Sequence, residues 1–120
     1  MTLRDRLEGM IGEVEGALAA SLVARDGMPV DSVWDDSLLD LEIVAAEMLA
    51  QVQFLADSDD NLSAGPVRLL SVSTNRHTVL LGAVSADYYL LLVLKPSANY
   101  GRARYEIRRA GLRFLDEIGA

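Results

Sequence analysis

The sequence predicts one α+β domain with its elements in the order α-β-β-α-β-β-β-α. Three observations lead to this fold class. Apolar residues recur at helical spacing near both ends of the chain and in its middle. Short apolar runs bounded by turn residues lie between these segments, which is typical of strands. The chain has 120 residues, enough to bury one hydrophobic core, so we expect residues 1–120 to form a single domain.

The composition argues against several classes of function. The sequence contains no cysteine, which excludes disulfides and thiolate metal sites. Its formal net charge of −7 argues against nucleic acid as a partner, because phosphate binding needs clustered Lys and Arg. The longest apolar run, residues 88–94, is far shorter than the roughly 18–20 residues of a membrane span, and the N-terminus does not resemble a secretory signal. We therefore expect a cytoplasmic protein without membrane insertion.

The first segment is expected to form a short amphipathic helix followed by a strand. Thr2 with Asp5 three residues later is an N-cap signal, and apolar residues follow at helical spacing as far as Val14. Residues 17–24 alternate larger and smaller apolar side chains on both faces. This pattern predicts a strand that is covered from two sides, near the middle of a sheet.

A hairpin is expected after this strand. The dipeptide Asp26-Gly27 tolerates positive φ at both central positions of a tight turn, so residues 28–34 should fold back as the next strand. This second strand contains Pro29, which has no N–H to donate to a strand ladder. We therefore expect it at one rim of the sheet, blunted against further pairing.

A long helix from about Leu38 to Ala56, capped by Asp35-Asp36-Ser37, is the most informative element. One broad apolar face suits the sheet and contains Leu38, Leu41, Val44, Ala45, Met48, Leu49, Val52 and Leu55. A second apolar stripe contains Leu39, Ile43, Ala46, Ala50 and Phe54. Because the sheet covers only one face, the second stripe predicts a homodimer in which two copies of the helix pack antiparallel about a two-fold axis. The alternative is that a terminal helix of the same chain covers this stripe.

The second half of the chain predicts an antiparallel meander and a final helix. The three expected strands are 67–74, 77–84 and 88–95, joined by short turns. Pro96 and Ser97 should end the last strand and open the C-terminal helix. Its apolar face contains Tyr100, Ala103, Ile107, Ala110, Gly111, Phe114, Leu115 and Ile118, and five arginines occupy its other faces.

No constellation of residues predicts catalysis, a cofactor or a metal. His77 is the only histidine and has no acidic neighbour to orient it, and the glycines do not form a phosphate-binding pattern. The loop that begins at Asp57 imitates a calcium loop, but Leu62 and Arg68 stand where glycine and glutamate are needed. We therefore predict that the chain is not an enzyme and has neither a cofactor nor a metal site.

Three segments together carry a family resemblance, namely the hairpin Leu22-Val-Ala-Arg-Asp-Gly-Met-Pro-Val, the alanine-rich helix 41–56, and residues 91–110 around Asn99-Tyr100-Gly101. They resemble the roadblock family, which includes dynein light chains of the roadblock type and small bacterial, gliding-protein-B-like regulators of Ras-like GTPases. The resemblance implies a five-stranded antiparallel sheet with the long helix on one face and the two terminal helices on the other.

The resemblance also implies how two chains would pair, namely through the strand 67–74 and the long helix. The expected dimer interface contains Leu39, Ile43, Ala46, Ala50, Phe54, Val67, Leu69 and Ser71. In the bacterial branch the partner of the dimer is a Ras-like small GTPase, for which the polar residues Asp40, Glu47 and Gln51 are the expected contacts.

The resulting hypothesis is a homodimeric adaptor that binds a Ras-like GTPase and modulates its GTP hydrolysis or its localisation. A profilin-like or PAS-like small-ligand sensor, whose sheet and helices share this general layout, is the alternative. A small hydrolase is a third class, but no set of residues supports it.

Overall fold

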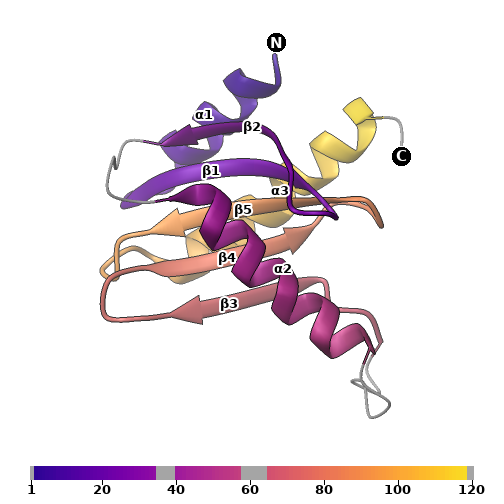
Figure 1. Ribbon diagram of the computed structural model, residues 1–120. Coiled ribbons are helices and arrows are strands. Elements are labelled where there is room, and N and C mark those ends of the chain that lie inside the picture. Colours follow the sequence, from indigo (N-terminus) through magenta and orange to yellow (C-terminus); the bar gives the residue numbers. More distant parts are fainter. Residues whose placement is uncertain (1, 35–39, 58–64, 119–120) are drawn as a thin grey trace.

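The chain folds into one antiparallel sheet with helices on both faces (Figure 1). The computed structural model describes residues 2–34, 40–57 and 65–118. In chain order the elements are α1 Leu3–Glu13, β1 Ala17–Ala24, β2 Pro29–Trp34, α2 Leu41–Asp57, β3 Leu69–Ser73, β4 Thr78–Ala83, β5 Tyr88–Leu94 and α3 Tyr100–Ile118. The α+β class and the order of elements predicted from the sequence are confirmed.

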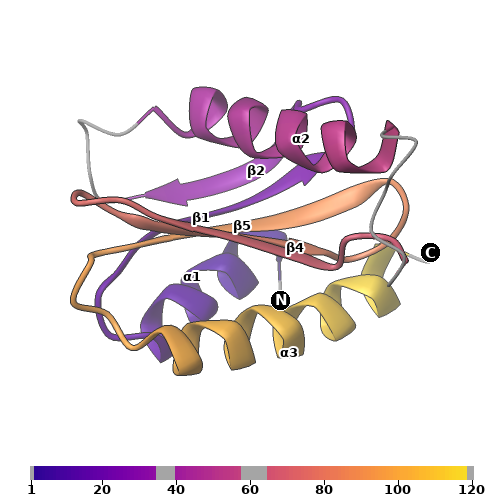
Figure 2. The same cartoon turned by 90° about the horizontal axis from the view of Figure 1, so that it is seen from below.

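The sheet has the strand order β2-β1-β5-β4-β3, and every neighbouring pair is antiparallel. Figure 2 shows α2 on one face and both α1 and α3 on the other. This three-layer arrangement is the one that the family resemblance implied.

Each face of the sheet has its own hydrophobic core. Under α2, buried side chains of the helix contact buried side chains of β1, β4 and β5. The helix contributes Ala45, Met48 and Leu49, and the strands contribute Ala19, Leu81 and Leu91. On the opposite face, α1 and α3 pack on the alternate residues of the same strands. The helices contribute Leu7, Met10, Ile107 and Phe114, and the strands contribute Leu80 and Leu92. Because successive strand residues point to opposite faces, β5 serves both cores, and its residues 90–94 are all buried.

Helix α1 begins with the predicted cap. The Thr2 hydroxyl accepts a hydrogen bond from the Asp5 backbone N–H, and the Asp5 carboxylate accepts one from the Thr2 backbone N–H, each at 3.1 Å. These hydrogen bonds to Thr2 hold the pKa of Asp5 below its ordinary value. The charged form of Asp5 is therefore the one that the cap stabilises.

The hairpin between β1 and β2 differs in detail from the prediction. Positive φ occurs at Gly27 (93°) and at no described residue other than glycine, so Asp26 does not adopt it. The Gly27 N–H donates to the Ala24 carbonyl, and the Met28 N–H donates to the Asp26 carboxylate. The connection is therefore a three-residue loop ending in a left-handed glycine, in which the Asp26 side chain supplies a hydrogen bond.

Both rims of the sheet are now defined. Among the described strands, β2, with Pro29 opposite Val23, pairs only with β1, which confirms the predicted rim. Strand β1 lies one position inside that rim and is buried on both faces, as its composition suggested. The other rim is β3, which pairs only with β4.

The helices α2 and α3 begin later than the sequence indicated. At α2, Asp40 accepts hydrogen bonds from the backbone N–H groups of Ile43 and Val44, so Asp40 acts as its N-cap. At α3, Asn99 does the same for Arg102 and Ala103. The predicted cap Asp35-Asp36-Ser37 and Leu38 lie outside the described residues. The predicted start of α3 at Pro96-Ser97 was wrong by about one turn, because Asn99 supplies the capping side chain.

Candidate functional site

The two faces of α2 differ sharply in burial. The face toward the sheet is covered, and its buried residues are Leu41, Ala45, Met48, Leu49 and Val52. The residues of the second stripe that the structure describes, Ile43, Ala46, Ala50 and Phe54, are all exposed. Ile43 is 56% and Phe54 70% exposed, although both are large apolar side chains. The predicted division of the helix into two faces is confirmed.

No terminal helix covers the stripe. Helix α1 packs on β1 and β2, helix α3 packs on β4 and β5, and both lie on the face of the sheet opposite α2 (Figure 2). The alternative in which a helix of the same chain buries the stripe is therefore excluded for α1 and α3. Leu39, the remaining member of the predicted stripe, lies outside the described residues.

The free rim of the sheet at β3 is in part packed against α2. Val67 and Leu70 pack against the core under α2. Leu69 packs instead against the core on the α3 side, and the Ser71 hydroxyl lies 2.7 Å from the Tyr100 hydroxyl of α3. Of the predicted interface residues, Val67 precedes β3 and packs on the α2 side, whereas Leu69 and Ser71 belong to β3 and lie on the α3 side.

The three polar residues expected to contact a partner have different surroundings. Glu47 and Gln51 are exposed on α2. Asp40 is also exposed, but its carboxylate already caps the helix. Only Glu47 and Gln51 are therefore available for a contact without cost to α2.

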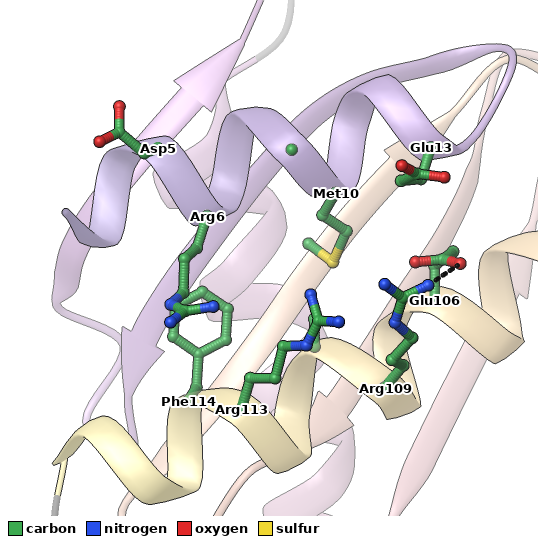
Figure 3. Close-up of a pocket in the computed structure, with 10 residues that line it drawn as sticks. Asp5, Arg6, Met10, Glu13, Glu106, Arg109, Arg113 and Phe114 are labelled. Atoms are coloured by element: carbon green, nitrogen blue, oxygen red, sulfur yellow. Dashed lines mark hydrogen bonds and ion pairs between the residues drawn. The ribbon is translucent and has the colours of Figure 1, made fainter. Parts of the chain in front are cut away.

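A hollow of about 170 Å³ lies between α1 and α3 (Figure 3). Three arginines line it, Arg6, Arg109 and Arg113, and so do three acidic residues, Asp5, Glu13 and Glu106. Glu106 is only 4% exposed and forms ion pairs with Arg102 at 3.1 Å and Arg109 at 3.4 Å. Because acids and arginines balance, the hollow has no net charge with which to select a ligand.

The described residues provide no catalytic or metal-binding arrangement. Among residues 2–34, 40–57 and 65–118, no group of three or more His, Asp or Glu side chains is placed to hold a metal ion. His77 lies before β4, where its backbone carbonyl accepts from Thr74. No helix within these residues is both long enough and apolar enough to cross a membrane.

Comparison with solved structures identifies the family. The crystal structure of MglC from Myxococcus xanthus is 32% identical, with a TM-score of 0.71, and the match covers 98% of this chain and 99% of that one. This chain belongs to the roadblock family. A Roadblock/LC7 domain from Streptomyces avermitilis matches the whole of both chains at a TM-score of 0.86 and 15% identity. An MglB structure with a tetrameric arrangement matches at 0.84 and 17% identity, covering 94% of this chain and 85% of that one.

The last two similarities concern the fold alone, since identity is low. No protein-family model matches the sequence, and no curated protein matches it. The roadblock assignment therefore comes from MglC and the fold.

This roadblock chain also exposes apolar residues that the sequence analysis did not assign to the site. Trp34 lies opposite Ala19, and Val72 lies opposite Val79, in register. Ala19 and Val79 both belong to the α2-side core, so Trp34 and Val72 point to the same face as α2. They are 51% and 39% exposed. The alternation of side-chain direction along a strand could have indicated that Trp34 and Val72 share a face. It could not have indicated that α2 would leave both side chains exposed.

Proposed function

We propose that this chain is a non-enzymatic, homodimeric adaptor that binds a Ras-like small GTPase and modulates its GTP hydrolysis or its localisation. The observation that carries the proposal is the apolar stripe of α2, which no described element of the chain covers. Large exposed apolar patches on a folded domain mark interaction surfaces. Membership of the roadblock family supports this class of function over a small-ligand sensor.

The proposed dimer buries the stripe against its symmetry copy. Two α2 helices cross antiparallel at Ala46 and Ala50, whose small side chains allow close approach. At the same time the free edge of β3 pairs with its copy, so that two five-stranded sheets join. The interface then comprises Leu39, Ile43, Ala46, Ala50, Phe54, Val67, Leu69 and Ser71, with Val72 added from its exposure.

The proposed GTPase contact uses the polar edge of α2 that remains outside this interface. Glu47 and Gln51 lie on that edge one helical turn apart. Asp40, at the start of the same edge, contributes mainly by holding the first turn of α2 in place. The dimer would present this edge twice, once from each copy.

The dimer is tested by light scattering during size-exclusion chromatography. The expected mass is twice the 13.0 kDa of one chain. Phe54→Asp should give folded protein at the mass of one chain, because an unpaired charge opposes burial of the stripe. Glu47→Arg, on the neighbouring exposed edge of α2, is the matched control and should remain dimeric. A dimer that persists in both variants would show that the stripe is not the interface.

The partner is tested with Ras-like GTPases encoded in the same genome. Each GTPase, loaded with GDP or with a non-hydrolysable GTP analogue, is titrated with wild-type protein and with the Glu47→Arg/Gln51→Arg variant by calorimetry. We expect binding that depends on the bound nucleotide and is at least tenfold weaker for the variant. Absence of binding in both nucleotide states would refute the GTPase role and leave the dimer untouched.

A further inference from the structure

A second surface, on the other face of the sheet, carries an independent inference. A groove of about 640 Å³ lies along α3 beside the β3–β4 end of the sheet. We call it the α3 groove. Its helical wall is formed by Arg104, Arg108, Gly111, Leu112 and Leu115, and its opposite wall by residues 68–69 and 82–85.

The groove forms because α1 and α3 together do not cover the whole of this face of the five-stranded sheet. Helix α1 packs on β1 and β2, and α3 packs mainly on β4 and β5. At the rim, β3 meets the α3 side through Leu69 and through the contact of the Ser71 and Tyr100 hydroxyls. Helix α3 approaches β4 closely at one point: a Cβ on Gly82 would lie 3.4 Å from two side-chain carbons of Ile107. The groove opens on the β3 side of this contact.

The charge of the groove is opposite to that of the protein. Its described lining includes three arginines, Arg68, Arg104 and Arg108, and no acidic residue. No ion pair joins any of the three to a carboxylate of the described chain. The hollow between α1 and α3 also contains three arginines, but there three acids offset them. On a chain of net charge −7, the α3 groove is therefore a local cationic site.

The apolar lining of the groove is elongated. Leu112 is a large apolar side chain of the helical wall and is 64% exposed. From Arg104 to Leu115 the helical wall extends about 16 Å, at 1.5 Å per residue. This length matches about three turns of a second helix rather than a compact small molecule.

We infer that the α3 groove binds an acidic amphipathic segment of a partner protein, as a helix of about three turns. Apolar side chains of the segment occupy the lining around Leu112 and Leu115, as in other helix-in-groove complexes. Asp or Glu residues flanking them pair with Arg104, Arg108 and Arg68, whose guanidinium groups can accommodate carboxylates bidentately. The binding weakens as ionic strength rises, because these charges lie near water.

The α3 groove and α2 are on opposite faces of the sheet, so the groove is separate from the proposed GTPase contact. The groove adjoins the proposed dimer edge at β3, where Leu69 belongs to both surfaces. The tests below leave Leu69 unchanged.

The inference is tested by selecting binders from a displayed library of random 16-residue peptides on immobilised wild-type protein. We expect the enriched peptides to combine Asp or Glu with Leu, Ile, Val or Phe at helical spacing. The strongest binder is then synthesised with a fluorescent label, and its affinity is measured by anisotropy at two salt concentrations.

Two variants remove the site in different ways. Arg104→Glu/Arg108→Glu reverses its charge, and the matched control Arg25→Glu/Lys95→Glu changes the net charge equally at exposed positions outside the groove. Gly111→Leu fills the groove, because a Cβ at Gly111 meets no atom within 4 Å, and Gly12→Leu makes the same change on α1. We expect at least a tenfold loss of affinity for each groove variant and less than a twofold change for each control.

Several outcomes would overturn the inference. They are the absence of enriched peptides, enrichment of peptides without acidic residues, and equal affinities for the groove and control variants. Flotation with phosphatidylglycerol vesicles that depends on Arg104 and Arg108, without peptide binding, would instead make a lipid surface the occupant. If the Arg104→Glu/Arg108→Glu variant has a lower solution mass than the wild-type protein, a second copy of the chain would be the occupant. Circular dichroism and melting temperature confirm that each variant is folded.

Discussion

Single residues in this chain are constrained by close contacts that the linear order does not reveal. Gly16 joins α1 to β1 with a φ of 91°, a conformation that L side chains rarely adopt. A Cβ at Gly16 would lie only 2.8 Å from the Cβ of Ala98, and the Gly16 carbonyl accepts a hydrogen bond from the Lys95 N–H. The contact of Gly16 with residues 95–98 is not visible in the sequence, because it depends on the fold.

We expect Gly16→Ala to lower the free energy of unfolding by about 1–3 kcal/mol, through backbone strain and the clash with Ala98. Gly12→Ala is the matched control, because Gly12 is helical and its Cβ would meet open space. It should raise stability by up to about 1 kcal/mol, the helix propensity difference between the two residues. Urea unfolding curves measure both changes, and equal effects would contradict this account of Gly16.

The burial of Glu106 is a second feature that the sequence does not predict. Its spacing to Arg102 and Arg109 on α3 is visible in the sequence and predicts ion pairs. Its burial is not visible, since it depends on how closely α1 approaches α3. Arginines of α3 that seemed alike in sequence therefore divide into those balanced by acids beside α1 and those left unpaired in the α3 groove.

At the scale of elements, α2 was predicted best and β3 least well. The apolar spacing of α2 predicted its buried and exposed faces residue by residue, because helical periodicity is a local property. For β3, the free edge was predicted, but the directions of Val67, Leu69 and Ser71 were not distinguished. In a strand near a rim, these directions depend on register and on which helices cover each face.

Adjacent residues of α2 provide a test of the two-faced helix. Ala45 is buried on the face of α2 that packs on the sheet, and Ala46 is exposed in the apolar stripe. We expect Ala45→Asp to destabilise the fold by several kcal/mol, because it buries an unpaired carboxylate. Ala46→Asp should leave the circular dichroism spectrum unchanged but shift the mass from dimer to single chain. Light scattering and thermal melts separate the two, and loss of folding in both would show that the stripe is part of the core.

On the scale of the whole molecule, the proposed dimer makes stability depend on concentration. When the dimer dissociates as it unfolds, a tenfold rise in protein concentration should raise the melting temperature by about 3 °C, given typical unfolding enthalpies for two chains of 120 residues. Differential scanning calorimetry across a hundredfold range measures this slope. The Phe54→Asp variant is expected to show none, and a flat response of the wild-type protein would argue against the dimer.

The sequence by itself determined the order of elements, the rim position of the strand with Pro29, and the surplus apolar stripe of α2. These features follow from periodicity and from backbone rules that act within a few residues. Only the tertiary structure decided the contact of Gly16 with Ala98, the burial of Glu106, and the cationic α3 groove. Each of these depends on which distant segments meet, and residues far apart in the chain meet only through packing of the complete sheet and its helices.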